Sequence, residues 1–417
     1  MQAVILAAGK SSRFYPFTNY SHKSLIKVAG KPLIVHTILS LRKAGIYEMI
    51  IVVGEESKIP SVVKSENLDV SIKFVVQKEP LGMGNAVLLA REHIKGDFLL
   101  LNAHHVDVDL FFNDLMGIKD GADAVLLSEE REDAWKYGVL QVEGQKVLDL
   151  VEKPKKQDLS SHLCVVGVYL FSKMFIDTLA KIPSEHYQLE TAISKFAKIR
   201  TVLMIKAKQK TITLKYPWDA LLVKNYLLNN LKSHISSKAK VAKSAEIIGN
   251  VYIDNGATIM EGACIKGPSY VGKNAVVGTK AIIRNGVDVE QDCVIGATIE
   301  IKNSLLQDGT TTHSGFIGDS VIGRKCKIAA AFETANVRID RKTIGVLVAD
   351  EKIDSGLNSL GVIMGDEVRV GIRVSIMPGV VIGQNATIGP STTVSRNIKE
   401  KVTYYTKFQE VVEEKRE

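Results

Sequence analysis

Ten aliphatic residues recur every six positions in the second half of the chain, and this repeat limits the fold more than any other feature. The run comprises Ile247, Ile253, Ile259, Ile265, Val271, Val277, Ile283, Val289, Ile295 and Ile301. A helix has a period of 3.6 residues and a strand a period of two, so neither explains the spacing. A repeat this short predicts a solenoid in which each turn buries an equivalent aliphatic side chain. Three hexads would make one triangular coil of three short strands.

The rhythm stops after Ile301 and resumes later in the chain. The second run comprises Met364, Val370, Ile376, Ile382, Ile388 and Val394. Glycine or asparagine recurs near the expected corners, where tight turns need a positive φ. We expect the charged tail, residues 397–417, to form a short helix that caps the last coil, because a solenoid end needs a polar cover.

Length and composition indicate two folded domains in the 417 residues, of which 46% are hydrophobic and 24% charged. The net charge of +8 comes from dispersed basic residues without an aromatic platform, so we expect no nucleic acid as partner. The spacing of the four cysteines is not that of a metal site, so we expect them to be reduced residues of the core. The apolar run at the start of the sequence is too short for a signal peptide or a membrane span. We therefore expect a cytoplasmic protein without membrane contact.

The first half reads as strands alternating with helices, which predicts parallel βαβ units in a doubly wound, Rossmann-like α/β sheet. We expect this domain at residues 1–235, the coil at 236–396 and the tail at 397–417. Expected strands are 3–7, 49–53, 74–77 and 98–101, and expected helices are 34–44, 85–94 and 218–231.

A loop that could cradle phosphates follows the first strand. Gly9 and Ser11 lie in this loop, and Arg13 and Lys23 follow it. Backbone N–H groups in such a loop and the two cations together suit a triphosphate. A single glycine makes the loop a weak signal when taken alone.

The chain resembles the sugar-1-phosphate nucleotidylyltransferases through several motifs in the family's order. The signature loop at residues 6–13, with Pro16 and Lys23 after it, is followed by GKPLI at 30–34, by Gln77 with Gly82-Met83-Gly84, by Tyr137-Gly138-Val139 and by Glu152-Lys153-Pro154. With the hexapeptide repeats behind these motifs, the whole chain is similar to the archaeal bifunctional uridylyltransferase/N-acetyltransferases that make UDP-N-acetylglucosamine.

The resemblance implies that a sugar phosphate oxygen attacks the α-phosphate of a nucleoside triphosphate, UTP or dTTP, and releases pyrophosphate. It implies catalytic roles for Arg13 and Lys23. The implied nucleotide-binding residues are Leu6, Ala7, Ala8, Gly9, Ser11, Gln77 and Gly82. The implied sugar-phosphate-binding residues are Gly138, Glu152 and Lys153.

The residues that hold Mg²⁺ in the resembled family are replaced in this chain. His104 stands where the first metal aspartate would be, and Thr213 stands where the second would be. Mg²⁺ prefers oxygen ligands in octahedral geometry, so a histidine is a poor substitute. His104, Asp107 and Asp219 remain as weak metal candidates, and the Mg²⁺ site is in doubt.

The coil resembles the left-handed β-helices of hexapeptide acyltransferases, which implies a homotrimer and acetyl-CoA as co-substrate. His313 matches the general base of the family, and an acyl transfer to an amine needs such a base. Arg284 and Lys302 match residues that grip the sugar phosphate, while Asn336 and Lys342 match further site positions. Phe316 replaces a tyrosine and Phe332 a glycine-rich stretch, so the acetyl-CoA groove would be narrower.

Three interpretations remain open from the sequence. The chain is an active sugar-1-phosphate nucleotidylyltransferase with an N-acetyltransferase in the coil, or a relative that binds nucleotide or sugar phosphate as a regulatory or structural subunit. In the second case a paralogous partner would complete the assembly. The third interpretation is an acetyltransferase whose first domain is a scaffold.

Overall fold

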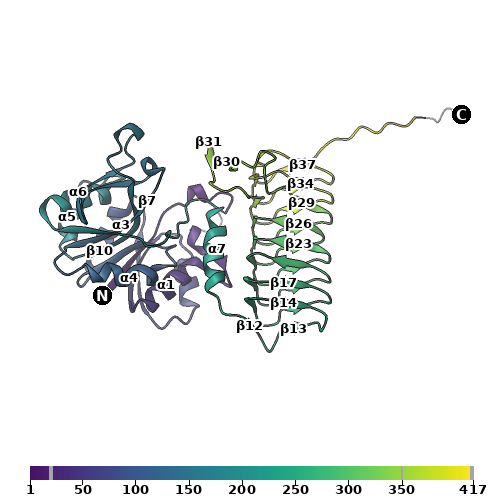
Figure 1. Cartoon of the computed structure of the whole chain (residues 1–417), viewed down its shortest axis with the longest axis horizontal. Coiled ribbons are helices and arrows are strands. Elements are labelled where there is room, and N and C mark those ends of the chain that lie inside the picture. The colour runs from purple at the N-terminus through teal and green to yellow at the C-terminus, as the bar shows by residue number, and fades with distance from the viewer. Residues whose placement is uncertain (18–21, 349–350, 414–417) are drawn as a thin grey trace. The chain divides into compact units, whose positions relative to one another are not determined.

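The computed structural model describes residues 1–17, 22–348 and 351–413. The chain forms two compact units, one comprising residues 1–11, 19–26 and 31–213 and the other residues 12–18, 27–30 and 214–417 (Figure 1). Two short segments near the N-terminus therefore belong to the same unit as the coil. These segments flank Lys23, which belongs to the first unit.

A nine-stranded sheet forms the centre of the first unit, in the order β5-β4-β1-β6-β10-β7-β11-β9-β8. The strands are β1 (Gln2–Ala7), β4 (Glu48–Gly54), β5 (Ser71–Gln77), β6 (Phe98–Asn102), β7 (Ala124–Glu130), β8 (Gly138–Glu143), β9 (Lys146–Glu152), β10 (Leu163–Phe171) and β11 (Val202–Lys206). β5, β4, β1 and β6 are parallel, which confirms the Rossmann-like prediction. β10 is antiparallel to β6 and β7, so the sheet is mixed, a feature that the predicted βαβ units did not include. The chain reaches β10 from the antiparallel hairpin β8–β9 rather than through a crossover helix.

Helices cover this sheet, and two of them lie where the sequence predicted helices, at 34–44 and 85–94. The helices are α1 (Leu33–Lys43), α2 (Ile59–Lys64), α3 (Met83–Ala90), α4 (Val108–Gly117), α5 (Phe175–Ala180) and α6 (Gln188–Ile199). α3, α5 and α6 pack into one apolar core with the sheet. α1 lies against α4, where the Ser40 hydroxyl donates to the Asp109 carboxylate at 2.8 Å. The helix α7 (Asp219–Asn230), expected at 218–231, belongs to the second unit.

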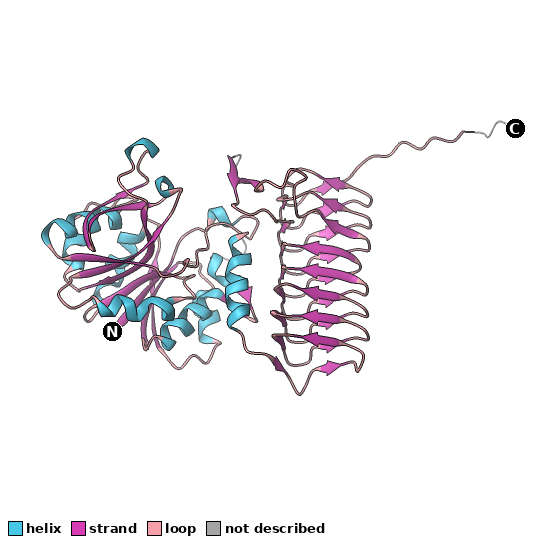
Figure 2. Cartoon of the chain, in the orientation of Figure 1, coloured by secondary structure: helices cyan, strands magenta, loops and turns pink. Residues whose placement is uncertain are grey.

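The second unit is a parallel β-helix built from three ladders of short strands, which confirms the predicted coil (Figure 2). The first coil sheet contains β12 (His234–Ile235), β15 (Val251–Ile253), β18 (Ser269–Val271), β21 (Val287–Val289), β24 (Leu305–Leu306), β27 (Val321–Ile322), β32 (Ile363–Met364) and β35 (Val381–Ile382). The second contains β13 (Lys240–Val241), β16 (Thr258–Ile259), β19 (Val276–Val277), β22 (Val294–Ile295), β25 (Thr311–Thr312), β28 (Lys327–Ile328), β33 (Arg369–Val370), β36 (Thr387–Ile388) and β38 (Thr403–Tyr404). The third contains β14 (Glu246–Ile248), β17 (Cys264–Lys266), β20 (Ile282–Arg284), β23 (Ile299–Lys302), β26 (Gly315–Gly318), β29 (Phe332–Thr334), β34 (Ser375–Ile376) and β37 (Thr393–Val394).

The coil continues through the region where the hexad rhythm stops. Ile283 pairs with Ile301, eighteen residues later, but Ile301 pairs with Ile317, only sixteen residues later. Shortened corners therefore change the spacing while the stacking persists. One insertion interrupts the coil between Ile322 and its stacked partner Met364. It carries the hairpin β30 (Gly345–Val348) and β31 (Glu351–Asp354).

The tail does not form the expected capping helix within its described part. Thr403 and Tyr404 extend the second coil sheet as β38, and Ile398 and Tyr404 close the end of the core. Residues 405–413 have no regular structure and are exposed. The cap is thus a last strand instead of a helix, because the aliphatic and β-branched residues preceding Tyr404 complete the coil. Among all described residues, no helix is long and apolar enough to span a membrane.

Candidate functional site

The predicted nucleotide-binding residues gather at the carboxyl edge of the first sheet. Ala7 pairs with Val53 at the end of β1, and Gln77 pairs with Gly54 at the end of β5. The Leu6 carbonyl accepts a hydrogen bond from the Ala103 amide, so the loop after β6 lies beside β1. Gly9 has open space around it, and Ala8 follows β1 directly. Ligands of such sheets bind at this edge.

Lys23 is anchored to the loop that follows β1. Its backbone N–H donates to the Ser11 hydroxyl at 3.0 Å, and Ser11 adopts a φ of 53°. Lys23 begins the short 3-10 helix η3 (Lys23–Leu25) and is half-buried. Arg13 is exposed in the 3-10 helix η1 (Ser12–Phe14), which belongs to the second unit.

Gln77 supports the glycine turn before α3. Its side-chain amide donates to the Gly82 carbonyl at 3.1 Å and to the Asn85 side chain at 2.8 Å. Gly82 has a φ of 98°, which favours glycine, and an added Cβ would lie 3.1 Å from the His186 carbonyl. The Gln77 amide is therefore engaged in shaping the turn, a role that the motif did not reveal.

The predicted sugar-phosphate residues come together on the hairpin β8–β9. Gly138 pairs with Glu152, and an added Cβ at Gly138 would lie 2.8 Å from the Glu152 carboxylate, so only glycine fits. Lys153 has a φ of 46° and donates from Nζ to the Tyr187 hydroxyl at 3.1 Å. The Lys153 Nζ also lies 3.7 Å from a Glu152 oxygen.

Glu190 is a buried carboxyl near this hairpin that the sequence motifs missed. It lies in the first turn of α6, is 6% exposed, and its Oε2 has no hydrogen-bond partner. Burial raises the pKa of Glu190 to about 7, and the charge of Glu152 adds to the rise. The sequence feature that could have revealed Glu190 is an acidic residue on the apolar face of α6, three residues before the buried Ile193.

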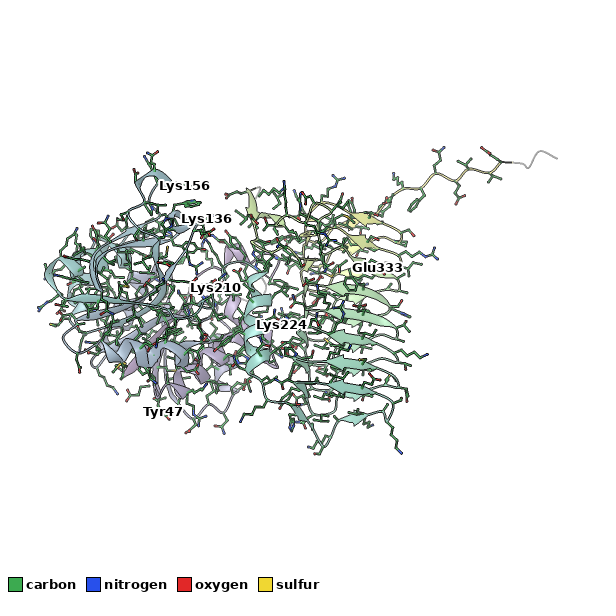
Figure 3. All side chains as sticks on the ribbon, in the orientation of Figure 1. Tyr47, Lys136, Lys156, Lys210, Lys224 and Glu333 are labelled. Atoms are coloured by element: carbon green, nitrogen blue, oxygen red, sulfur yellow. The ribbon has the colours of Figure 1, made fainter. Side chains whose placement is uncertain are left out.

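Lysines surround an aromatic ring next to the same hairpin. The Lys136 and Lys156 ammonium groups lie 5.8 and 4.6 Å from the Trp135 ring centroid. Figure 3 labels both lysines in the same part of the unit. An ammonium group over an aromatic face is attracted by the ring's negative face, and the Lys136 ammonium is also paired with Asp133 at 3.3 Å.

His104 and His105 form a buried pair after β6. Their rings stack with centroids 4.9 Å apart, and His105 is fully buried, with no hydrogen-bond partner for either ring nitrogen and the Asp107 carboxylate 3.7 Å from Nδ1. Burial holds the pKa of His104 well below its usual value, and the nearby Lys23 charge lowers it further. Burial also lowers the pKa of His22 to about 3. His22 and His104 therefore offer uncharged ring nitrogens, whereas Mg²⁺ prefers anionic oxygen ligands.

The described residues do not fit a resident Mg²⁺ ion. The Asp107 Oδ2 atom accepts the Ile212 amide at 2.9 Å, and its Oδ1 atom faces His105 at 3.7 Å. The Asp219 Oδ2 atom accepts the Lys215 and Tyr216 amides at the start of α7. Within the described ranges, no group of three or more histidine, cysteine, aspartate or glutamate residues could hold a metal ion. Mg²⁺ at phosphate sites takes one or two carboxylates besides water and phosphate oxygens, and His104 and Thr213 stand where the resemblance places those carboxylates.

Two predicted phosphate-binding cations stack in register on the third coil sheet. Arg284 pairs with Lys302, and Lys302 pairs with Gly318 one coil later. The Arg284 guanidinium lies 2.6 Å from a Glu300 oxygen. Both cations remain partly exposed, at 33% and 24% of their side chains. Arg284 is paired with Glu300 and Lys302 with Asp319, so each cation of the column lies beside a carboxylate while part of its side chain is open to solvent.

Asp319 is the buried acceptor that orders this cluster. Its carboxylate accepts from the Lys302 ammonium at 3.0 Å and from the Asn336 amide at 2.5 Å. Its other oxygen accepts from the Asn303 amide at 2.7 Å. The network continues from Asn303 to the buried Lys224 of α7, labelled in Figure 3, at 3.1 Å. The resemblance included this aspartate in a motif but gave it no role.

His313 lies apart from the cluster that Asp319 holds. It precedes β26, whereas Asp319 follows it, and four strand residues span about 10 Å. His313 is exposed, and its carbonyl would lie 1.8 Å from a Cβ added at Gly296. Lys342 lies in the insertion, exposed, with its amide donating to Asp340 at 3.3 Å. The structure thus brings Arg284, Lys302 and Asn336 into one region but leaves His313 at another corner.

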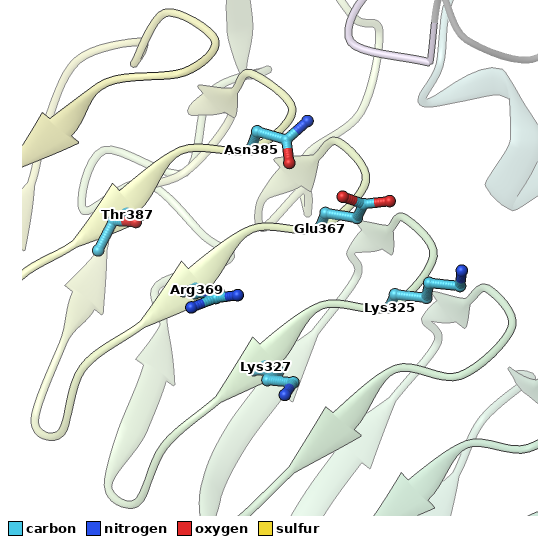
Figure 4. Close-up of a pocket in the computed structure, with 6 residues that line it drawn as sticks. All are labelled: Lys325, Lys327, Glu367, Arg369, Asn385 and Thr387. Atoms are coloured by element: carbon cyan, nitrogen blue, oxygen red, sulfur yellow. The ribbon is translucent and has the colours of Figure 1, made fainter.

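A cationic groove of about 510 Å³ opens on the second coil sheet (Figure 4). Its lining residues are Lys325, Lys327, Glu367, Arg369, Asn385 and Thr387. Thr311, two residues before His313, pairs with Lys327, and Lys327 pairs with Arg369. The groove therefore lies on the strands stacked directly beyond the one that leads to His313. The sequence reasoning missed it, because its cations come from different coils.

Comparisons with known proteins agree with this architecture. The nucleotidyl transferase family model matches residues 2–218, and hexapeptide-repeat transferase models match residues 268–300 and 361–396. A relative called bifunctional protein GlmU from Methanococcus maripaludis strain C7 is 40% identical over all of both chains. A bifunctional sugar-1-phosphate nucleotidylyltransferase/acetyltransferase from Sulfurisphaera tokodaii is 32% identical, over 95% of this chain and 98% of its own.

A solved structure also resembles the first part of the chain. It is a putative glucose-1-phosphate thymidylyltransferase from Bacillus anthracis, 19% identical, which covers 56% of this chain and 98% of its own with a TM-score of 0.49. The assignment of this chain to a family rests on the family model and on the relatives that match over nearly their full length. This chain belongs to the family of bifunctional sugar-1-phosphate nucleotidylyltransferase/acetyltransferases.

Proposed function

We propose that the first unit joins a nucleoside triphosphate, UTP or dTTP, to a sugar 1-phosphate. The observation that carries the proposal is the convergence of Lys23, the Ser11 loop and the Gln77–Gly82 turn on one sheet edge. The reaction forms a bond between a sugar phosphate oxygen and the α-phosphorus. It breaks the bond to the β-phosphate, which leaves as part of pyrophosphate.

The chain's own residues supply positioning and positive charge for this reaction. Lys23 would neutralise charge at the α-phosphate, and Arg13 would hold the terminal phosphates. Gly138, Glu152 and Lys153 would hold the sugar and its phosphate. Because the described residues do not fit Mg²⁺, we derive no step through a resident metal.

We further propose that the coil transfers an acetyl group from acetyl-CoA to an amino-sugar phosphate. Arg284 and Lys302 would bind the sugar phosphate, and the exposed imidazole of His313 would accept the ammonium proton. The cationic groove suits the phosphates of the acyl donor. His313 and the Asp319 cluster lie at opposite ends of β26, so a homotrimer in which a neighbouring copy completes each site would join them. We place this chemistry in the cytoplasm.

A second candidate function is nucleotide or sugar phosphate binding without turnover, as a regulatory or structural subunit. The buried neutral His104 favours it, since the edge keeps its cations but offers no set of metal carboxylates. A missing metal site removes several kcal/mol of transition-state stabilisation, which corresponds to orders of magnitude in rate.

Pyrophosphate release distinguishes the two functions. The full chain is incubated with UTP or dTTP, glucosamine 1-phosphate or N-acetylglucosamine 1-phosphate, and Mg²⁺, Mn²⁺ or Co²⁺. Release that is lost in Lys23→Met supports nucleotidylyl transfer. Calorimetric nucleotide binding without release under any metal supports the binding subunit instead. In parallel, release of the CoA thiol from acetyl-CoA in the presence of glucosamine 1-phosphate tests the coil.

A further inference from the structure

A lysine lies on the buried face of α7, where the other buried residues are apolar. Lys224 is fully buried, and the buried residues beside it are Ala220, Leu221, Val223 and Leu228. A buried ammonium costs free energy unless hydrogen bonds replace its water. Packing of α7 alone would be served by another apolar side chain, so the polar contacts of this lysine account for its presence. The helix and all of these contacts belong to the second unit.

Three acceptors surround the Lys224 ammonium group. It donates to the Gly286 carbonyl, to the Asn225 side-chain oxygen at 2.6 Å and to the Asn303 side-chain oxygen at 3.1 Å. An ammonium group has three N–H donors and no acceptor, so these contacts use all of its hydrogen-bonding capacity. Two of the three acceptors lie on corners of the coil, and the third is the next residue of α7.

The contact with Lys224 sets the direction in which the Asn303 side chain points. The Asn303 Oδ1 atom accepts from the Lys224 Nζ and from the Asn225 side-chain amide, at 3.1 Å in each case. The Asn303 Nδ2 atom therefore faces the other way and donates to the Asp319 carboxylate at 2.7 Å. An amide turned by half a rotation would place its oxygen against this carboxylate and its N–H groups against the ammonium, so both contacts would be repulsive.

Asp319 connects Asn303 to two residues of the proposed acetyl-transfer site. Its Oδ1 atom accepts from Asn303, and its Oδ2 atom accepts from Lys302 at 3.0 Å and from Asn336 at 2.5 Å. The Asp319 side chain is 3% exposed and the Lys302 side chain 24% exposed, so the Lys302 ammonium lies between a buried carboxylate and solvent. The place of this ammonium therefore depends on how the carboxylate is held.

We propose that Lys224 is a positioning residue for the sugar phosphate site of the coil. By orienting the Asn303 amide it fixes the Asp319 carboxylate, which in turn holds the Lys302 ammonium where a sugar phosphate arrives. This inference rests on the proposed acetyl transfer to an amino-sugar phosphate. Small displacements of a charged group are costly, because rates and affinities depend on geometry at the scale of about 1 Å.

The test uses full-length variants that break the network at two different points. Lys224→Met keeps a side chain of similar length but removes all three donors. Asn303→Gly removes the amide that links Lys224 to Asp319, and glycine readily adopts the φ of 43° found at this corner. The matched control is Lys232→Met, which removes the same charge at an exposed position just after α7.

Steady-state acetyl transfer gives the KM for glucosamine 1-phosphate and for acetyl-CoA, and calorimetry gives the Kd for glucosamine 1-phosphate alone. We expect both constants for glucosamine 1-phosphate to rise about tenfold in Lys224→Met and in Asn303→Gly, since a hydrogen bond to a charged group contributes on this scale. The KM for acetyl-CoA should stay within about twofold of the parent value, because the groups that bind the acyl donor are untouched. Lys232→Met should match the parent in every constant.

The second variant keeps the test valid if the first does not fold. Asn303→Gly leaves Lys224 its contacts with Gly286 and Asn225, so α7 stays attached to the coil while the link to Asp319 is lost. A tenfold rise in this variant alone therefore supports the positioning role, because attachment of the helix does not depend on it.

Two results would overturn the inference while leaving the proposed acetyl transfer intact. One is an unchanged Kd for glucosamine 1-phosphate in the folded variants, which would mean that Lys224 only attaches α7. The other is an equal rise of both KM values, which would mean that the substitutions damage the coil as a whole. If the parent binds glucosamine 1-phosphate but transfers no acetyl group, the proposed transfer fails and the Kd values decide the positioning role. If the parent does not bind this sugar phosphate, both proposals are wrong.

Discussion

The two candidate sites differ in how their buried polar groups are satisfied. In the coil, Asp319 accepts from three side chains, and each bond links a residue proposed for acetyl transfer or its neighbour. At the sheet edge, His105 is equally buried, but neither ring nitrogen has a hydrogen-bond partner. Buried polar groups in proteins are normally paired. The comparison indicates that the polar cluster around Asp319 is ordered by contacts within the chain, with His313 apart from it, whereas the sheet edge has cations but lacks carboxylates at positions 104 and 213.

The largest effect is expected from His313→Ala, which tests whether the coil half is catalytic. A general base contributes about 10²- to 10⁴-fold to rate, so acetyl transfer to glucosamine 1-phosphate should fall by that factor. Sugar phosphate binding should remain, because Arg284 and Lys302 are untouched. Release of the CoA thiol measures the rate, and equal activity in variant and parent would remove His313 from the mechanism.

Asp319→Ala should lower the free energy of unfolding of the coil by about 3 kcal/mol, because it leaves the partly exposed Lys302 and two amides without their acceptor. Urea denaturation followed by circular dichroism measures the change. Asp340→Ala is the control, since Asp340 is exposed and pairs with Arg338 in the insertion. A loss below about 1 kcal/mol would mean that the network is not what orders the site.

Glu190→Gln should change how stability depends on pH. The folded-state pKa of Glu190 is raised to about 7, so its contribution to stability is complete below the unfolded pKa near 4.5 and is lost as pH rises through about 7. The glutamine variant lacks this loss. We expect its stability relative to the parent to increase by up to about 3 kcal/mol between pH 4.5 and pH 8. Thermal unfolding at several pH values measures this, and a constant difference would contradict the buried-acid assignment.

Carboxylates introduced at the sheet edge should give the first unit the metal ligands that it lacks. In His104→Asp/Thr213→Asp, pyrophosphate release should gain a dependence on Mg²⁺ and rise by at least about tenfold over the parent. The matched control is His104→Asn/Thr213→Asn, which has the same shape without the charges. Equal Mg²⁺ responses in the two double variants would show that the missing carboxylates do not limit pyrophosphate release.

Much of the fold could be predicted from local patterns. The six-residue spacing predicted which positions of the coil are buried, and Ile253, Val277 and Ile301 are fully buried as predicted. The shortened corners after Ile301 escaped the pattern because corner length is set by stacking on the previous turn. The strand β10 runs antiparallel because it follows a hairpin, and periodicity does not report strand direction.

The family motifs predicted the location of the candidate site but not the contacts between its residues. The loop after β1 and the hairpin β8–β9 lie where the family motifs indicated. The bonds of Gln77 within its own turn, the role of Asp319 and the bond from Lys224 to Asn303 depend on contacts between residues distant in sequence or on side-chain direction. No spacing rule encodes such contacts.

Calorimetric titration of UTP and dTTP into the full chain, in EDTA and in Mg²⁺, tests most directly the claim that cations of the chain hold the phosphates. Lys23 and Arg13 carry their charge without a metal, so we predict Kd values that agree within about threefold between the two buffers. Binding that disappears in EDTA and returns with Mg²⁺ would contradict the account, because it would require metal ligands that the described residues do not provide.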